Sequence, residues 1–460
     1  MKENIKYNKI HMIGIGGISM SGIAHILLKW GYKVSGSDRN DSAILNGLRE
    51  AGAEIFIGHN SENITNQDLV VYTAAIPENN PERIKASELD IKIMERAEFL
   101  GELTKLYPKT IAVSGTHGKT TTTSMISLCF LEANLDPSIQ VGSIVPQING
   151  NYKVGNSEYF VIEACEYVNS FLHFYPQTEV ILNIEADHLD FFKDIQDIRN
   201  SFKQFTDILP TNGNLIINLD NDECRQLITE IKDDINILTY SIENPDANIY
   251  AFNIIFDDAG FATFDIKYND NIIKDIKLNV IGIHNVSNAC ACIATCLTHN
   301  IDFEDIKEGL LKFKGSQRRF EFKGNMANGC PVYDDYAHHP TEIKALLNAC
   351  SNKNQDRIIA VFQPHTYSRT KTLFNEFIDC FDKCDLLILT DIYAAREIDD
   401  GTISTQMLVD SINKKYPNKA IYISSFDDIA QYIQDTANSN DIVLTIGAGS
   451  ITTLSNLLVK

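Results

Sequence analysis

The sequence predicts an α/β protein built from three domains, and three observations support this. Its 460 residues correspond to about three domains of ordinary size. Apolar residues make up 44% of the chain, enough for packed cores, and no apolar run is long enough to span a bilayer. Short apolar strands alternate with helical segments, which is typical of parallel sheets covered by helices. We expect the domains at 1–107, 108–314 and 315–460.

The first domain begins with a β-α-β pattern around a glycine-rich turn. A strand at 9–13 leads into Gly14-Ile15-Gly16-Gly17-Ile18-Ser19-Met20, and after a helix a second strand ends at Asp38. Such a turn presents backbone N–H groups to a pyrophosphate, and an acidic residue follows about 20 positions later in dinucleotide-binding folds. We therefore expect a Rossmann-like domain that binds a nucleotide through Gly14, Gly16, Gly17, Ser19, Met20 and Asp38. The pattern fits NAD, FAD or another pyrophosphate nucleotide, and no second nicotinamide signature follows it.

The second domain begins with a phosphate-binding loop. The buried-strand run at 110–113 is followed by Ser114-Gly115-Thr116-His117-Gly118-Lys119-Thr120-Thr121 and then by a helix with apolar periodicity. Backbone N–H groups and the positive end of the helix dipole point at an anion in this arrangement. Lys119 would reach the β- and γ-phosphates, and the Thr120 hydroxyl suits Mg²⁺. This shortened G-x-x-G-K-T loop predicts binding of a nucleoside triphosphate.

Two later strands of this domain end in side chains that suit a metal ion. Glu163 ends the first, and Glu185, Asp187 and His188 follow the second. Because the carboxyl ends of parallel strands converge on one crevice, we expect these side chains near the Lys119 loop. Carboxylate oxygens with one imidazole suit Mg²⁺ or Mn²⁺ better than zinc.

An antiparallel insert and a second Rossmann-like domain are expected in the remainder of the chain. Residues 247–280 alternate without helical periodicity, which predicts an antiparallel insert in the mostly parallel sheet of this P-loop-type ATPase domain. Strand–helix alternation resumes near Gly315 and predicts the Rossmann-like fold of the third domain. The imidazole and guanidinium groups that follow its strands are His338, His339, His365 and Arg369. Such groups are costly to bury without an anionic partner, so we expect a carboxylate or phosphate ligand there.

Charge and cysteine usage restrict the partners and the compartment. With 61 acidic and 40 basic residues the net charge is −21, which argues against nucleic acid or an anionic membrane as a partner. The ten cysteines include no C-x-x-C pair and no zinc-spaced cluster, so we expect buried free thiols in a reducing cytosol. Met1–Asn4 leads directly into a strand without the apolar region of a signal peptide. We expect a cytoplasmic protein, either a monomer or a homodimer.

Taken in order, the motifs resemble the Mur ligase family over the whole chain. The segments that carry the resemblance are 11–17, 34–38, 115–121, 183–188, 284–285, 318–321, 334–340 and 362–365. Any one could arise by chance, but the ordered set is very specific. The resemblance implies an N-terminal domain that holds a UDP-sugar, a central ATPase, and a C-terminal Rossmann-like domain that closes over both. The motifs are most similar to those of members that join L-alanine to UDP-N-acetylmuramate.

The resemblance also implies roles for individual residues. Lys119 would hold the γ-phosphate of ATP, with Thr120 and Glu163 on one Mg²⁺ and His188 on a second. The further ATP contacts implied are His284 and Asn285 at the adenine, Arg319 at the phosphates and Asp334 near the ribose. The residues implied to receive L-alanine are Tyr336, His338 and Arg369.

This chain departs from the family pattern at three positions. Ser19 replaces the usual third glycine of the turn, and Cys165 stands where the family often has Asp. Thr366 replaces an arginine found in many members, which leaves Arg369 as the expected carboxylate anchor. Several sister ligases carry a carbamylated lysine on the helix where Lys203 lies, but the surrounding match is poor, so Lys203 is not counted among the expected site residues.

The implied reaction is ATP-dependent formation of an amide. In-line transfer of the γ-phosphoryl group to the lactyl carboxylate of UDP-N-acetylmuramate would give an acyl phosphate, with Mg²⁺ and Lys119 neutralising charge. The neutral amine of L-alanine would then attack and expel phosphate, giving UDP-N-acetylmuramoyl-L-alanine for peptidoglycan synthesis. Two alternatives stay open. One is a ligase that attaches a preformed peptide to the same UDP-sugar in wall recycling. The other is a non-catalytic nucleotide sensor, which would leave Lys119, Glu163 and His188 unexplained.

Overall fold

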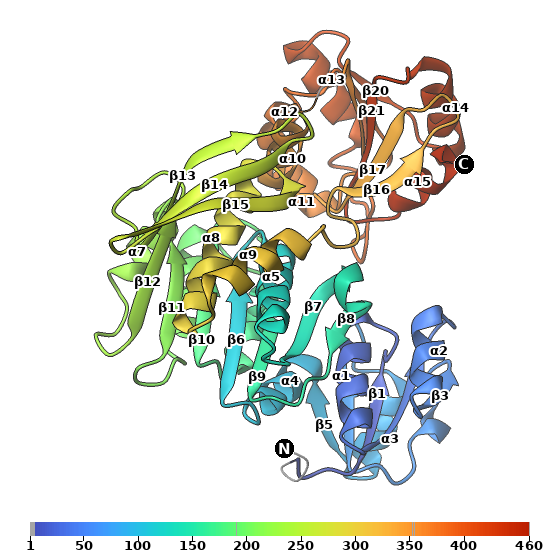
Figure 1. Ribbon diagram of the computed structural model, residues 1–460. Coiled ribbons are helices and arrows are strands. Elements are labelled where there is room, and N and C mark those ends of the chain that lie inside the picture. Colours follow the sequence, from blue (N-terminus) through green and yellow to red (C-terminus); the bar gives the residue numbers. More distant parts are fainter. Residues whose placement is uncertain (1–4, 190, 352, 354, 460) are drawn as a thin grey trace. The chain divides into compact units, whose positions relative to one another are not determined.

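The computed structural model (Figure 1) describes residues 5–189, 191–351, 353 and 355–459. The chain forms two compact units. The first unit comprises 1–184, 196–240 and 291–309, and the second comprises 185–195, 241–290 and 310–460. Three sheets, mostly parallel with antiparallel strands in two of them, confirm the predicted three-domain α/β class. Met1–Asn4, on which the signal-peptide expectation rests, lie outside the described residues. Within the described part of the chain, no helix has both the length and the apolarity to cross a membrane.

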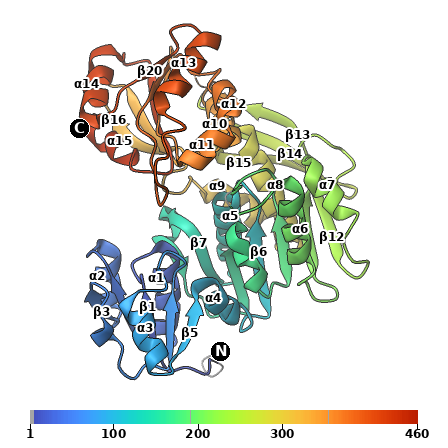
Figure 2. The ribbon, with the colours of Figure 1, turned by 180° about the vertical axis from the view of Figure 1, so that it is seen from behind.

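The N-terminal part of the first unit is a five-stranded parallel sheet in the order β3-β2-β1-β4-β5. Its strands are β1 (Lys9–Ile13), β2 (Lys33–Asp38), β3 (Glu54–Ile57), β4 (Leu69–Tyr72) and β5 (Lys92–Glu95). The helices that follow them are α1 (Ile18–Lys29), α2 (Ala43–Glu50), α3 (Pro81–Glu88) and α4 (Arg96–Thr104), all in blue in Figure 2. The start of α3 is set locally, because the Asn80 side chain accepts from the backbone N–H groups of Glu82 and Arg83.

The larger sheet of the first unit has β6 near its centre. Its order within this unit is β12-β11-β10-β6-β9-β7-β8, and only β8 runs antiparallel to its neighbour. The strands are β6 (Lys109–Ser114), β7 (Ser138–Val145), β8 (Gly150–Lys153), β9 (Tyr159–Glu163), β10 (Thr178–Ile181), β11 (Asn214–Asn218) and β12 (Asn236–Ser241). Its helices are α5 (Lys119–Glu132), α6 (Ile195–Thr206) and α7 (Asp222–Ile228). Ile111, Ala112 and Val113 of β6 are fully buried, as expected for a strand covered on both faces.

The second unit contains the predicted antiparallel insert and a six-stranded sheet. The insert is β13 (Ile249–Phe256), β14 (Phe261–Tyr268) and β15 (Asn271–Ile281), paired antiparallel in sequence order. The sheet has the order β16-β17-β21-β18-β19-β20, with only β16 antiparallel. Its strands are β16 (Glu321–Asn325), β17 (Pro331–Asp335), β18 (Ile358–Phe362), β19 (Leu386–Leu389), β20 (Ala420–Tyr422) and β21 (Ile442–Ile446). Its helices are α10 (Pro340–Ser351), α11 (Tyr367–Thr372), α12 (Phe374–Asp379), α13 (Thr405–Lys415), α14 (Phe426–Thr436) and α15 (Thr452–Leu458).

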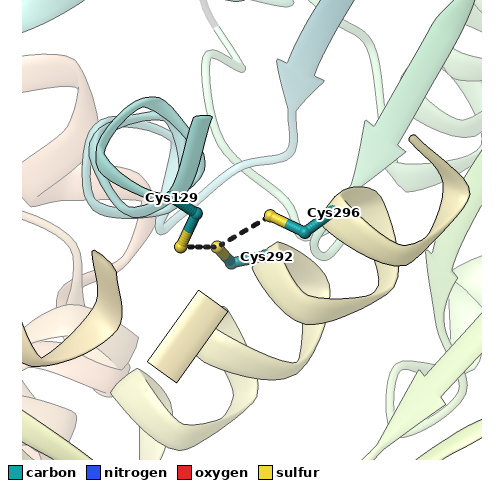
Figure 3. Close-up of side chains that lie close together, drawn as sticks. All are labelled: Cys129, Cys292 and Cys296. Carbon is teal, nitrogen blue, oxygen red and sulfur yellow. Dashed lines mark hydrogen bonds between the residues drawn. The ribbon is translucent and has the colours of Figure 1, made fainter. Parts of the chain in front are cut away.

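Three buried cysteines meet between α5 and α8 (Ile283–Thr298), the helix that leads to α9 (Phe303–Lys312). The Cys292 Sγ lies 3.6 Å from that of Cys129 and 4.0 Å from that of Cys296 (Figure 3). All ten cysteines are free thiols, as expected, although the sequence spacing did not predict this cluster. Three sulfur donors are one fewer than a structural zinc takes, so we interpret the cluster as packing of α5 against α8.

Candidate active site

The loop that joins β6 to α5 is shaped by two glycines and one asparagine. Gly115 and Gly118 have φ angles of +136° and +84°, which glycine adopts far more readily than other residues. Asn183 accepts the Thr116 N–H on its backbone oxygen at 3.1 Å and the His117 N–H on Oδ1 at 2.8 Å. The loop is therefore fixed to the segment after β10, and the N-terminus of α5 is available to an anion.

Lys119 is paired with a carboxylate that the sequence analysis did not single out. Its Nζ lies 2.9 and 3.2 Å from the two carboxylate oxygens of Glu166 and donates to the Gly115 carbonyl oxygen at 2.6 Å. Burial favours the neutral amine, but the Glu166 charge outweighs it and raises the pKa of Lys119 above its usual range. Burial, with the nearby Glu166 charge, raises the pKa of Cys165 to about 11, so this residue is a neutral thiol at pH 7.

Thr120 and Glu163 meet beside the loop. The Thr120 hydroxyl donates to Glu163 Oε2 at 3.0 Å, and the backbone N–H of Gly142 donates to the same oxygen at 2.7 Å. A carboxylate and a hydroxyl at the entrance to α5 are hard oxygen ligands of the kind that Mg²⁺ prefers. The residues present therefore fit the ion that the resemblance implies.

The glycine-rich turn before α1 is held by the end of β2. The Gly14 N–H donates to the Ser37 carbonyl at 2.8 Å, and the Gly16 N–H donates to Asp38 Oδ2 at 3.0 Å. A Cβ at residue 16 would lie 2.8 Å from that oxygen, so glycine is needed for this contact. Gly17 caps α1 and is exposed, whereas Met20 is buried within the helix.

Ser19, the departure from the usual third glycine, has two side-chain donors. Its hydroxyl accepts from Gln140 Nε2 at 2.8 Å and from Arg96 Nη1 at 3.3 Å. The serine therefore fastens the start of α1 to β7 and α4.

In the second unit, Arg369 of α11 binds Asp187. Arg369 Nη2 and Nε donate to Asp187 Oδ1 at 2.9 and 3.3 Å, and Nη1 donates to the backbone oxygen of His365 at 3.0 Å. Burial opposes ionisation of Asp187, but His188 and Arg369 outweigh it and hold the pKa of this carboxyl well below its usual range. Burial, reinforced by the Arg369 charge, lowers the pKa of His365 to about 4.

Tyr336 and His338 lie beside this pair. The His338 and His365 rings have centroids 5.9 Å apart, and the Tyr336 ring is 5.5 Å from that of His338. Burial lowers the pKa of His338 to about 4, so its ring is neutral at pH 7. The guanidinium carbons of Arg318 and Arg319 lie 4.9 and 5.4 Å from the centre of the Tyr336 ring. The three residues expected to bind L-alanine are thus gathered in one part of the second unit, through His365.

Asp334 is fully buried and both of its oxygens have partners. Arg318 Nε donates to Oδ2 at 3.0 Å, and the Thr445 hydroxyl donates to Oδ1 at 2.6 Å. The resemblance implies that this carboxylate lies near the ATP ribose, which stays a prediction; in this structure it holds Arg318. Arg318 and Phe320 both have positive φ angles, +58° and +50°, which marks the turn as strained.

Arg319, His284, Asn285 and His188 complete the expected set, all within the second unit. Arg319 Nη1 lies 3.8 Å from Glu342 Oε1. Asn285 Nδ2 donates to the Ile281 carbonyl at 2.8 Å, and His284 is exposed at the start of α8. His188 has a φ of +53°, and its N–H donates to Asp187 Oδ1 at 2.7 Å.

Comparison with known proteins covers all of these regions. Residues 9–108 match the model described as "Mur ligase family, catalytic domain", residues 113–296 the "Mur ligase middle domain", and residues 318–449 the "Mur ligase, glutamate ligase domain". A UDP-N-acetylmuramate–L-alanine ligase of Clostridium novyi is 51% identical over 460 residues, which is 100% of this chain and 98% of that protein. The chain belongs to the Mur ligase family.

Other Mur ligases agree with this assignment. The UDP-N-acetylmuramate–L-alanine ligase of Clostridium tetani is 52% identical, with 99% of each chain covered. The crystal structure of UDP-N-acetylmuramate-alanine ligase MurC from Thermotoga maritima matches with a TM-score of 0.81 at 28% identity and 97% coverage of both chains. A murein peptide ligase from Psychrobacter arcticus matches with a TM-score of 0.72 at 25% identity and 98% coverage of both chains.

Several residues that shape this Mur ligase site were missed from sequence. Glu166, Gly142 and Gln140 were not singled out, and Arg318 was noted only as part of a motif. The second carboxylate in Glu163-Ala-Cys-Glu166 is a usable signal for a lysine partner. Gly142 and Gln140 carry no local signal, because their role depends on how β7 passes β9 and α1.

Proposed function

We propose that this chain joins L-alanine to the lactyl carboxylate of UDP-N-acetylmuramate, using ATP and Mg²⁺. Its products are UDP-N-acetylmuramoyl-L-alanine, ADP and phosphate. Full-length relatives with this activity in their names, at about half identity, support the choice of substrates. We also propose that it works in the cytoplasm, where these small molecules are its partners.

The observation that carries the proposal is the arrangement of Lys119, Thr120 and Glu163 around the start of α5. A mostly buried ammonium group, a hydroxyl and a carboxylate lie where an anion would meet the helix N-terminus. Phosphoryl transfer depends mainly on positioning and on neutralising charge at the γ-phosphate. A Mg²⁺ ion held by Thr120 and Glu163 would supply further positive charge; His188 as a second metal ligand stays a prediction.

The proposed reaction has two steps. A lactyl carboxylate oxygen attacks the γ-phosphorus, the bond to the β-bridging oxygen breaks, and ADP leaves. The neutral amine of L-alanine then attacks the acyl carbon, loses a proton, and the tetrahedral intermediate expels phosphate. Lys119 neutralises the transferring group in the first step, and the glycine turn at 14–17 holds the UDP pyrophosphate throughout.

Arg369 is the proposed anchor for the L-alanine carboxylate, with Tyr336 and His338 beside it. The planar guanidinium suits paired hydrogen bonds to a carboxylate. Since the pKa of His338 is about 4, its ring is neutral at pH 7 and adds no positive charge beside the amine, whose proton leaves with the expelled phosphate. Support for this proposal comes from the guanidinium group of Arg369 lying close to two neutral imidazole rings.

The runner-up is ligation of a preformed peptide to the same UDP-sugar. A murein peptide ligase shares the fold, but its identity of 25% is about half that of the clostridial L-alanine ligases, and its TM-score of 0.72 is below the 0.81 of the Thermotoga maritima L-alanine ligase. The nucleotide-sensor alternative still leaves Lys119, Thr120 and Glu163 unexplained.

ADP release measured with each pair of substrates tests the proposal. We expect turnover with UDP-N-acetylmuramate and L-alanine, and little with a tripeptide as the amine. Faster turnover with the tripeptide would favour the runner-up. Calorimetric titration of the protein with NAD and, separately, with UDP-N-acetylmuramate adds a binding test. Heat of binding with NAD but none with UDP-N-acetylmuramate would refute the UDP-sugar assignment.

A further inference from the structure

Strand β7 changes its partners where it passes the two substrate-binding turns. Its parallel pairing with β9 ends at Gln140 opposite Ile162. Two residues later the Gly142 N–H donates to the side chain of Glu163 at 2.7 Å. Beyond Gln140, the backbone of β7 therefore donates to the Glu163 carboxylate, which also accepts from the Thr120 hydroxyl.

Gly142 is needed at this point for space. A Cβ there would lie 2.8 Å from Glu163 Oε2 and 2.9 Å from Oε1, closer than real Cβ contacts. Its backbone does not have the positive φ that would itself require glycine. Glycine at 142 thus permits the position of the Glu163 carboxylate, and alanine would displace it without straining the backbone.

The same strand is fastened to the glycine-rich turn. Gln140 is buried and its Nε2 donates to the hydroxyl of Ser19 at 2.8 Å and to its carbonyl at 3.2 Å. On β8, Asn151 Nδ2 donates to the Ile18 carbonyl at 2.8 Å. The β7–β8 hairpin is therefore tied to the first turn of α1.

We propose that the segment Gln140–Gly142 is a positioning element shared by two sites, which fixes the UDP-sugar turn at one end and the metal carboxylate of the ATP site at the other. Gly142 sets the place of Glu163, and Gln140 sets the place of the turn through Ser19. This rests on the proposed function, because it assigns the two turns to UDP-N-acetylmuramate and ATP. The element acts through Glu163 and Ser19 and need not touch substrate.

The test compares Gly142→Ala with Gly150→Ala in the full-length protein. Gly150 lies on the same hairpin, but a Cβ there would come no closer than 3.9 Å to its neighbours. Mn²⁺ binding in the presence of a non-hydrolysable ATP analogue, measured by electron paramagnetic resonance, reports on the Glu163 carboxylate without turnover. Because loss of an outer-shell partner of a metal site weakens metal binding roughly 10- to 100-fold, we expect a loss of at least about tenfold in Gly142→Ala only.

The second arm uses Gln140→Ala. We expect a higher KM for UDP-N-acetylmuramate with Mn²⁺ affinity unchanged, whereas Gly142→Ala should raise the Mg²⁺ requirement of ADP release and leave that KM unchanged. Thermal unfolding checks that each variant is folded. Unchanged Mn²⁺ affinity in Gly142→Ala, or an equal loss in Gly150→Ala, would overturn the proposal. Failure of the proposed function would look different: the unmodified protein would release no ADP with these substrates while the Mn²⁺ comparison still stood.

Discussion

Lys119 and Glu166 form a mostly buried ion pair, with Nζ 2.9 and 3.2 Å from the two carboxylate oxygens. A lysine held this way is already desolvated and oriented. A bound phosphate would therefore take the place of the Glu166 carboxylate as the anionic partner of Lys119. Binding ATP then requires the ammonium group to exchange a carboxylate for a phosphate oxygen. Glu166 thus holds Lys119 in the charged form that the proposed reaction needs.

Replacing Lys119 by alanine should remove both its charge and the partner of Glu166. We expect ADP release to fall by ~10³-fold or more, as when a phosphate clamp is lost. We also expect lower thermal stability, because breaking a buried ion pair destabilises by roughly 3–5 kcal/mol. The double variant Lys119→Ala, Glu166→Gln is the control: it should recover stability but not activity. Near-normal turnover in the single variant would refute the role of the loop.

Removing Arg369 should weaken L-alanine binding in particular. A charge-assisted pair contributes about 1.5–3 kcal/mol, or roughly 10- to 150-fold in KM. Steady-state kinetics of Arg369→Ala, with each substrate varied in turn, should show the KM for L-alanine rising far more than that for ATP. Asp187→Asn is the comparison variant, because it weakens the hydrogen bonds that orient Arg369 and keeps the positive charge of Arg369. A rise confined to the KM for ATP would place Arg369 at the nucleotide instead.

His299 should make stability depend on pH in the mildly acidic range. Burial, with a smaller effect from Lys109, lowers its pKa to about 4, so the unfolded chain binds a proton that the folded chain does not between about pH 6.5 and 4. The contribution of His299 to the free energy of unfolding is therefore fully present above about pH 6.5 and is lost as the pH falls towards 4. The free energy of unfolding, measured with denaturant at several pH values, should change less steeply with pH in His299→Gln, by about 1.4 kcal/mol per pH unit over this range. Parallel curves for the two proteins would contradict this.

Glu179 of β10 should destabilise the first unit as the pH rises. It is fully buried, neither carboxylate oxygen has a hydrogen-bond partner, and burial, reinforced by Asp207, raises its pKa well above the usual value. A raised folded pKa means that the carboxyl favours folding fully at low pH and less as the pH rises through that value. We expect Glu179→Met to stabilise the protein by about 1–3 kcal/mol at pH 8 and by less at pH 5. A gain of equal size at both pH values would contradict the raised pKa, because the carboxyl would then bind the same number of protons in the folded and unfolded chains.

Much of the candidate site could be predicted from local sequence. Gly115–Lys119 and the turn at 14–17 were found because strand, glycine turn and helix are adjacent in the chain, and their conformations need particular residues. Glu166 could have been predicted in the same way, because it follows Glu163 closely in the chain. Asp334 was identified as special, but only its burial between Arg318 and Thr445 showed which partners it has.

The sequence by itself determined the α/β class, the antiparallel insert, the phosphate-binding loop and the family, because each depends on residue order over short ranges. Tertiary structure alone decided that Arg369 meets Asp187, that Gly142 makes room for Glu163, and that Cys129 meets Cys292. These pairs are separated by 182, 21 and 163 positions in the chain. Contacts at such separations follow from how sheets and helices pack, and no local pattern of residues records them.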